Sequence, residues 1–383
     1  MRSARQFLLA AGVVAAAMTP AFSAYKGHAD NRDVEAVLAA YPALKGTPAD
    51  SCATCHTTGA VRDPLRAGVT RRENHCDFCH AVFVRDGRPI AETLNRYGLA
   101  YLAAGRGVTA VRTLAVGDSD GDGTSNDAEF RKGTNPGDPA SHPSVPQAPS
   151  RTYTVADLGS LSPIVLQTIF VNSTKSRSGD SYSDYRGHTA WEVLQAVGVL
   201  DEADSVDLLS VDGYERTFTL DELRQSWEQA PPVAKLGKED LGACGWVSYG
   251  SSRLEAGKPL PRARVMLAFE ENGRGFEKAR LDPVTGRLVG KGPLRSVAPQ
   301  FRIAPPDLPQ TADPSCSARV PAENRFHEEY DHNAGAGVSA IVAVRVKPLP
   351  KGTRDIDWQT PAATYLAEEK IVFFGAIKAG GRK

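Results

Sequence analysis

The sequence predicts a multidomain protein in which a small, mainly α-helical domain is followed by a larger mixed α+β domain. Its 383 residues are more than one compact core usually holds, so two or three domains are expected. A stretch at 135–150 is rich in proline and small polar residues, which is typical of a stiff, extended linker. Apolar residues have helical spacing at 90–102, before this stretch. After it, strand-like runs alternate with helical ones; they include 205–211, 214–220 after an Asp-Gly turn, and 370–374, and Thr189 is placed to cap a helical run at 189–197. We therefore place the domain boundary at the linker and expect the larger domain to span 151–383.

The first 23 residues have the pattern of an export signal. Arg2 and Arg5 supply a positive start, an apolar run covers 7–18, and small residues stand at the spacing of a cleavage site in 21–23. The alternative is a membrane anchor, but a helix needs about 20 apolar residues to span a bilayer and this run is shorter. No later segment is apolar enough to span. We expect a cleaved signal peptide at 1–23 and a mature chain in the periplasm or outside the cell, without a membrane span.

Two C-x-x-C-H runs lie in the segment 24–116: Cys52-Ala-Thr-Cys55-His56 and Cys76-Asp-Phe-Cys79-His80. This spacing is the attachment signature of c-type haem, because two thiols one turn apart add to two vinyl groups of the porphyrin and the adjacent histidine binds iron. A zinc ribbon and a thioredoxin-like redox pair are the alternatives, but neither requires a histidine directly after the second cysteine twice. We therefore expect two covalently bound haem c groups, with His56 and His80 as proximal ligands, in a small dihaem cytochrome c domain.

Histidines are the expected distal ligands of both haems. The chain has three methionines, of which two lie in the signal and Met266 lies far downstream, so a thioether ligand is nearly excluded. His28 lies near the mature N-terminus, and His75 precedes Cys76 and reaches the neighbouring haem more easily than its own. A surface position is the alternative for each histidine. Two nitrogen ligands give low potentials and a filled coordination sphere, which favours electron transfer over oxygen chemistry.

An acidic loop in the segment 117–134 matches the twelve-residue calcium loop. Gly123 permits its sharp turn. The following G-T-N-P-G-D-P run resembles the calcium loops of thrombospondin type 3 and related bacterial repeats. An acidic turn without metal is the alternative. We expect a structural Ca²⁺ that makes the exit from the haem domain rigid, with these ligands: Asp118, Asp120, Asp122, the backbone carbonyl of Thr124, Asn126 and Glu129.

Four runs in the larger domain occur in an order that resembles a known family. They are G-H-T-A-W-E-V-L-Q-A-V-G-V-L from Gly187, S-V-D-L-L-S-V-D-G-Y-E-R-T-F-T-L-D-E-L from Ser205, V-M-L-A-F-E-E-N-G from Val265 and G-K-G-P-L-R-S-V-A-P-Q from Gly290. Together they resemble the molybdopterin-binding domain of the sulfite oxidase class, which implies a fold of that type. With the two C-x-x-C-H runs and the calcium loop, the chain resembles bacterial dihaem cytochromes with a Gly-Glu-Gly-Pro motif. That motif here is Gly-Lys-Gly-Pro at 290–293, so one position departs.

The cysteine that this family places on molybdenum is missing. It precedes the helix that here contains Trp191-Glu-Val-Leu194, and the segment 151–187 contains no cysteine. Cys244 and Cys316 lie after that helix, and in an exported domain a disulfide between them is the simpler expectation. A polar run at 327–333 holds metal-capable side chains, but a solvated loop is the simpler interpretation. A similar fold without its metal ligand does not predict the enzyme's activity.

These features favour an exported electron-transfer protein that exchanges single electrons with redox partner proteins of a respiratory chain. The 45 lysines and arginines balance 45 aspartates and glutamates, so there is no sign of a basic surface for nucleic acid. In this hypothesis the larger domain is a docking or scaffold module and not an enzyme. One alternative is an oxidoreductase whose larger domain binds a cofactor or substrate and uses the haems as an internal relay. Another is a purely structural role of that domain in an assembly of like molecules.

Overall fold

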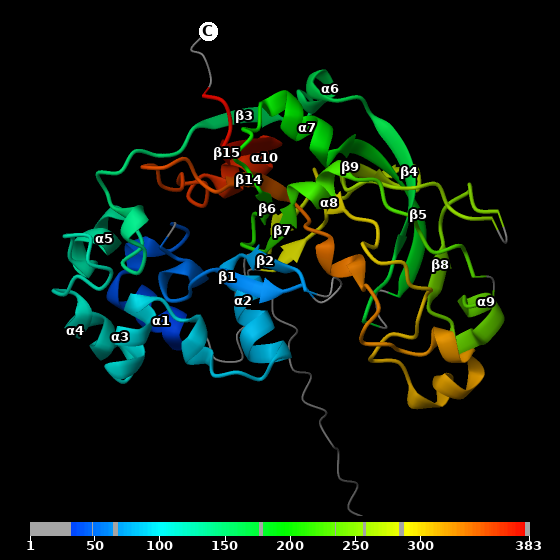
Figure 1. Cartoon of the computed structure of the whole chain (residues 1–383), viewed down its shortest axis with the longest axis horizontal. Helices are drawn as coiled ribbons and strands as arrows, with labels where there is room; N and C mark the ends of the chain where they lie inside the picture. Colours follow the sequence, from blue (N-terminus) through cyan, green and yellow to red (C-terminus); the bar gives the residue numbers. More distant parts are fainter. Residues whose placement is uncertain are drawn as a thin grey trace, which may run out of the picture.

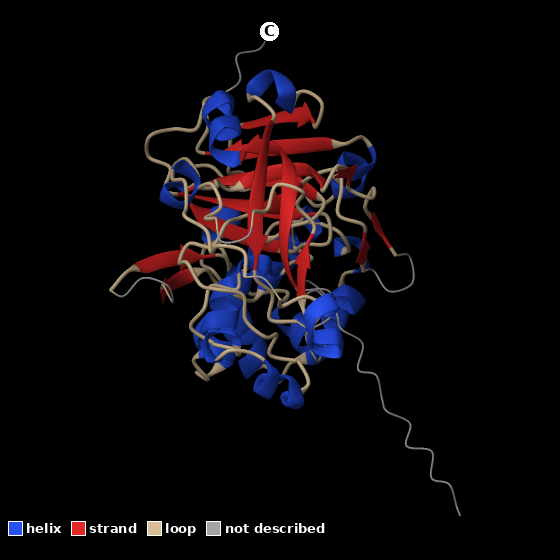
Figure 2. Ribbon diagram, turned by 90° about the vertical axis from the view of Figure 1, so that its right-hand side faces the viewer, coloured by secondary structure: helices blue, strands red, loops and turns tan. Residues whose placement is uncertain are grey.

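The structure is a computed structural model that describes residues 32–379, except residues 48 and 234 and the segments 64–67, 176–178, 256–257 and 283–286. The expected signal peptide at 1–23 and the candidate ligand His28 lie outside the described residues. Most N-terminal helices gather at one end of the molecule, and the two large sheets lie beside them (Figures 1 and 2). Within the described part of the chain, no helix is both long and apolar enough to cross a membrane.

Short helices and one hairpin form the N-terminal part, because glycines, prolines and polar caps interrupt the chain every few residues. Tyr97, Val111 and Phe130 lie in its apolar cluster, and the rings of Tyr97 and Phe130 meet edge to face at 5.4 Å. Asn95 begins one helix by accepting a hydrogen bond from the Gly98 N–H. The elements are α1 (Arg32–Ala40), η1 (Pro42–Leu44), η2 (Cys52–Thr54), β1 (Gly59–Arg62), β2 (Thr70–Glu73), α2 (His75–Cys79), η3 (His80–Arg85), η4 (Ile90–Thr93), α3 (Arg96–Ala103), α4 (Gly107–Leu114), α5 (Asn126–Lys132) and η5 (Pro139–Ser141).

Two sheets build the larger part. One has five strands in the order β3-β15-β14-β6-β7, and the other has the path β10-β9-β5-β4, with β13 beside β9 and β8 beside β5. The strands are β3 (Ser150–Thr154), β4 (Val165–Val171), β5 (Asp180–Thr189), β6 (Ser205–Ser210), β7 (Glu215–Thr219), β8 (Val247–Tyr249), β9 (Met266–Glu271), β10 (Arg274–Gly275), β13 (Arg295–Val297), β14 (Ile341–Lys347) and β15 (Lys370–Gly375). A further small pair is β11 (Arg280–Leu281) and β12 (Leu288–Val289).

Helices cover these sheets or connect their strands. They are α6 (Leu158–Leu161), α7 (Ala190–Val197), α8 (Leu220–Arg224), α9 (Lys238–Leu241), η6 (Gly242–Cys244), η7 (Pro314–Arg319), η8 (Ala322–Asn324), η9 (Asn333–Ala336) and α10 (Ala362–Ala367). Thr219 begins α8 with a complete capping box, in which its hydroxyl accepts from the Glu222 N–H and the Glu222 carboxylate accepts from the Thr219 N–H. Thr189, which we expected to cap α7, stands at that position without a side-chain capping bond.

The central strand β14 shows why the five-stranded sheet forms. Its sequence is rich in β-branched residues, and it lies between antiparallel β6 and parallel β15. Val344 and Val346 belong to the apolar cluster on one face, and Val342 belongs to the cluster on the other. A near-continuous apolar run is what a strand buried on both faces requires. The Asp-Gly turn expected after β6 is present, with Gly213 at a φ of 83°.

The predicted fold class is wrong. Across its described residues the chain is a mixed α/β structure with several sheets, and no small, mainly α-helical cytochrome domain stands apart. The segment between the two C-x-x-C-H runs forms the β1–β2 hairpin. We expected a mainly helical domain because of the helical spacing at 90–102, and that spacing gave no sign of these strands. Polar side chains from this hairpin and from α2 contact β7 and α8, so the N-terminal part packs against the five-stranded sheet (Figure 1).

The proline-rich stretch at 135–150 is fastened to the larger part. Ala148 is buried, and its N–H donates to the Arg354 carbonyl at 2.8 Å. The Arg354 guanidinium donates to the Val145 carbonyl at 2.9 Å. Backbone and side-chain bonds therefore hold this extended stretch along its path.

Candidate functional site

The first C-x-x-C-H run forms a single tight turn, η2. Its start is capped by Ser51, whose hydroxyl accepts a hydrogen bond from the Ala53 N–H at 3.2 Å. The His56 N–H donates to the Cys52 carbonyl at 2.8 Å, which brings the two cysteines and the histidine onto one turn. Cys55 packs against the N-terminal apolar cluster. The turn therefore offers one partly exposed thiol, one thiol against the core and an imidazole beside them.

The orientation of His56 is set by Thr93 in η4. The Thr93 hydroxyl donates its one proton to the Ile90 carbonyl at 2.7 Å and lies 2.8 Å from His56 Nδ1. Because that proton is already used, Nδ1 must be the donor toward Thr93. Neutral His56 therefore carries its lone pair on Nε2, which is the tautomer that binds a metal through Nε2. The sequence offered no signal for Thr93, which lies 37 residues further along the chain.

The second C-x-x-C-H run starts with a helical turn. The Asn74 side chain caps α2 by accepting from the Asp77 N–H at 2.8 Å. Cys76 and Cys79 stand three residues apart in this helix, so their thiols lie on one face. His80 follows at the start of the π-helical segment η3 and is exposed. The order of two thiols on one turn followed by an imidazole is thus repeated.

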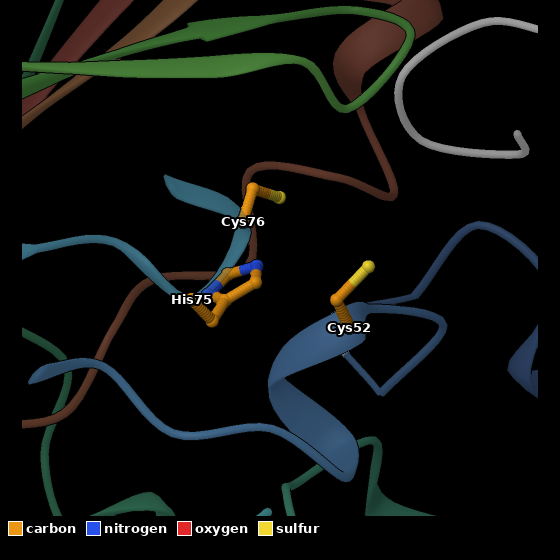
Figure 3. A group of neighbouring side chains, drawn as sticks. All are labelled: Cys52, His75 and Cys76. Atoms are coloured by element: carbon orange, nitrogen blue, oxygen red, sulfur yellow. The ribbon is translucent and has the colours of Figure 1, made fainter. Parts of the chain in front are cut away.

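The two runs meet at one place. The ligand atoms of Cys52, His75 and Cys76 all lie within 4.8 Å of one another, and Figure 3 shows their side chains facing a common space. The hydroxyl of Thr93 also lies within hydrogen-bonding reach of the Cys79 thiol. Nothing in the 24-residue spacing of the runs, Cys52 to Cys76, required this contact. His75 is buried there, whereas His80 is not part of the group.

Three thiols of the two runs, Cys55, Cys76 and Cys79, have raised pKa values. Burial, with smaller effects of Asp33 and Cys52, raises the pKa of Cys55 to about 12. A hydrogen bond with Cys52 and then burial raise the pKa of Cys76 well above its usual value, and burial raises the pKa of Cys79. Catalytic redox thiols and zinc ligands act as thiolates and have lowered pKa values. A thioether is uncharged, so the same burial does not oppose it.

No protein-family model matches this sequence, and no curated protein is significantly similar to it. What the site binds must therefore be inferred from its own side chains. The donor set fits haem c: each run has two thiols on one turn, a histidine next to them and partly buried surroundings. Phe83 and Val84 are exposed beside His80, where a porphyrin face would cover apolar surface of this kind.

The acidic loop brings its first three carboxylates together. The ligand oxygens of Asp118, Asp120 and Asp122 lie within 4.8 Å of one another. Asp118 accepts from the N–H groups of Gly121 at 2.7 Å and Gly123 at 2.9 Å, so backbone donors shape the loop. This is the turn that the glycine positions predicted.

Two expected ligands of this loop, Asn126 and Thr124, make hydrogen bonds within the protein. The Asn126 amide donates to the Leu114 carbonyl and the Ser119 hydroxyl, and its oxygen accepts from the Ser119 N–H. Asn126 therefore braces the loop through both its amide nitrogen and its oxygen. Thr124 donates its N–H to the Asp122 carboxylate, which leaves the expected role to its carbonyl.

Buried oxygens in this loop fit a hard cation. One carboxylate oxygen of each of Asp120, Asp122 and Glu129 is buried and has no hydrogen-bond partner among the described residues. Burial and repulsion by neighbouring carboxylates raise the pKa of Asp120 to about 6 and of Glu129 to about 8. Carboxylate oxygens of this kind are ligands that Ca²⁺ prefers. The residues present therefore suit calcium.

Calcium is expected to stabilise the protein strongly at pH 8 and weakly at pH 5. Without calcium, both raised pKa values lie above the unfolded values of about 3.9 and 4.3, so the stability linked to these carboxyls is present at low pH and is lost as pH rises through about 6 and then about 8. Calcium replaces those protons. At about 100 times its Kd it adds about 2.7 kcal/mol.

Thermal unfolding with Ca²⁺ and with a chelator, at pH 5 and pH 8, measures this difference. Glu129→Gln should lose the response to calcium. Exposed Glu92, which pairs with Arg88, gives a matched control in Glu92→Gln, which should keep the response. Equal unfolding temperatures of the parent protein with and without calcium at pH 8 would contradict the calcium site.

Hydrogen bonds connect the acidic loop to the first C-x-x-C-H turn. Arg96 in α3 donates to the Asp120 carbonyl at 2.7 Å. Its neighbour Asn95 donates to the Ala53 carbonyl at 2.9 Å, and Asn135, which follows the loop helix, donates to the same carbonyl at 2.7 Å. A series of hydrogen bonds thus links the acidic loop to the turn that carries Cys52 and Cys55.

In the larger part, the two remaining cysteines are not available as metal ligands. Cys244 and Cys316 are joined in a disulfide, 72 residues apart in the chain. His332 lies 3.3 Å from the Asp307 carboxylate, and neither His327 nor His332 belongs to a metal-capable group within the described residues. The chain as a whole has six cysteines, so all four thiols outside this disulfide belong to the C-x-x-C-H runs.

Proposed function

We propose that this chain is an exported dihaem c-type cytochrome that transfers single electrons. The observation that carries the proposal is the meeting of two C-x-x-C-H runs at Cys52, His75 and Cys76. Haem bound there would supply an iron that alternates between two oxidation states. Cys52, Cys55 and His56 would hold the first haem, and Cys76, Cys79 and His80 would hold the second.

Histidine ligation on both faces of each haem belongs to the same proposal. His75 is buried beside Cys52 of the first run, which supports it as the distal ligand there. His28 is the candidate for the second haem. Filled coordination spheres favour electron transfer with redox partner proteins of a respiratory chain, in the periplasm or outside the cell.

Metal and spectroscopic analysis of the purified full-length protein tests the proposal. We expect two iron atoms and one Ca²⁺ per chain, no molybdenum, and two covalently bound haems in the haemochrome spectrum. The reduced protein is expected not to bind carbon monoxide. One molybdenum per chain would instead support an oxidoreductase with the haems as internal relay, and protein without covalent haem would overturn the proposal.

A further inference from the structure

The five-stranded sheet meets the candidate haem site at its edge strand. β7 is the last strand of the five-stranded sheet, and such an edge has unpaired groups that proteins commonly cover. The Asn74 amide donates to the Thr217 hydroxyl at 3.2 Å, and the Arg216 guanidinium lies 3.6 Å from the Asp77 carboxylate. The start of the second C-x-x-C-H run therefore packs directly on β7 (Figure 1).

Glu215 is the residue of β7 that reaches His75. Its Oε1 lies 3.2 Å from His75 Nε2, and the side chains are 4% and 11% exposed. No hydrogen bond among the described residues reaches this buried oxygen, so the contact is close but not yet aligned. An unpartnered buried carboxylate oxygen costs free energy unless a donor is brought to it. A small rotation of the His75 ring would supply that donor.

The sheet holds Glu215 in place from behind. Arg345 in β14 donates to Glu215 Oε2 at 3.0 Å and also binds Asp207 at 2.8 Å and Asp355 at 2.7 Å. Lys347 reaches the other oxygen of Asp207 at 2.8 Å. Two cations thus face three carboxylates, and the Thr217 hydroxyl donates to Asp207 at 2.6 Å. Glu215 lies between this group and His75.

We infer that Glu215 positions His75 as an axial ligand of the haem at the first C-x-x-C-H run. Histidine ligands of metals commonly donate their second ring N–H to a carboxylate, which orients the ring and makes the ligating nitrogen more basic. Here the carboxylate comes from the larger part of the chain, 140 residues after His75 (215 − 75). The larger part therefore tunes a haem that it does not itself carry. This inference rests on the proposed haem attachment.

The test compares Glu215→Gln with a matched change at the same contact, Glu222→Gln, in full-length protein. Glu222 binds Arg71 of the β1–β2 hairpin at 3.1 Å, and glutamine still suits its capping box, so this control weakens the contact without touching His75. We measure haem content, carbon monoxide binding by the reduced protein, low-spin ferric electron paramagnetic resonance and the midpoint potential of each haem.

Glu215→Gln should keep two covalent haems, raise the potential of one haem and change its resonance signal, with the other haem unaffected. Carbon monoxide binding should rise from none to at most one per chain. Glu222→Gln should match the parent protein. If His75→Ala alters one haem and Glu215→Gln alters neither, Glu215 has no positioning role. The same conclusion follows if Glu222→Gln changes the potential and resonance signal of a haem as much as Glu215→Gln does.

Two further outcomes distinguish a failure of this inference from a failure of the proposed haem attachment. Absence of covalent haem in the parent protein overturns the proposed function, whereas two haems that His75→Ala leaves unchanged overturn only the role of His75. If Glu215→Gln does not fold, Glu215→Asp is tested instead. Aspartate keeps the negative charge that Arg345 binds, but its shorter side chain places the carboxylate further from His75. That variant should show an intermediate shift of one haem, and two parental potentials in it would contradict the inference.

Discussion

Replacing Cys76 and Cys79 together with alanine is expected to leave one covalent haem per chain instead of two. Both thioether bonds of the proposed second haem would depend on these thiols, which lie on one face of α2. Haem retained by His80 alone would be lost under denaturing conditions. Intact-mass spectrometry of the denatured protein and iron analysis measure the loss, and Cys52→Ala with Cys55→Ala should give the same result for the first haem.

A thiol-matched control is available in the same chain. Cys244→Ala with Cys316→Ala also removes two sulfur atoms, but they form the disulfide of the larger part and lie outside both C-x-x-C-H runs. This variant is expected to be less stable by about 2–4 kcal/mol and to keep both haems. Two covalent haems in the Cys76/Cys79 variant, or a loss of haem from the disulfide variant when it is folded, would contradict the assignment of the attachment sites.

Arg345→Met is expected to lower the free energy of unfolding by about 3–5 kcal/mol, because it leaves buried carboxylates without their shared cation. The Arg345 side chain is 14% exposed, and its partners Asp207 and Glu215 are 0% and 4% exposed. Denaturant unfolding of the calcium-loaded protein measures the change. Arg262→Met is the control, since Arg262 and its partner Glu228 are more than half exposed. It should change stability by about 0–1 kcal/mol.

The pH dependence of the Arg345 variant provides a second check. Burial alone would raise the pKa of Asp207, but Arg345 and Lys347 outweigh burial and lower it to about 2. The folded pKa of Asp207 lies below its unfolded value of about 3.9. The stability that ionised Asp207 contributes is therefore fully present above about pH 3.9 and is lost as the pH falls through about 2. The difference in unfolding free energy between the parent protein and Arg345→Met should therefore become smaller as the pH falls from 5 to 2. A deficit that is constant over this range, or equal to that of Arg262→Met, would mean that the ion group contributes little.

Local patterns predicted the elements that lie in one continuous stretch. The strand-like runs at 205–211, 214–220 and 370–374 correspond to β6, β7 and β15 to within one residue at each end, and the Asp-Gly turn lies where expected. These segments were predictable because alternation, turn chemistry and β-branched residues act within a few residues. The β1–β2 hairpin was missed because its short strands carry arginines and little apolar alternation.

The candidate sites divide in the same way. The calcium loop spans twelve consecutive positions, so its carboxylates could be numbered from the sequence, whereas the brace made by Asn126 depends on how Leu114 and Ser119 approach it. Thr93 and Glu215 carry no motif of their own. Each becomes relevant only because the folded chain brings it to a histidine of the haem site.

The sequence by itself determined which thiols and imidazoles stand one turn apart, because that spacing is a property of a short piece of backbone. It also determined the order of acidic oxygens in the calcium loop. Only the tertiary structure decided that the two C-x-x-C-H runs meet, and that β7 lies at the edge of its sheet against α2. β7 lies at the edge because β6 pairs on its other side with β14, more than a hundred residues further along the chain, and no local spacing encodes such pairing.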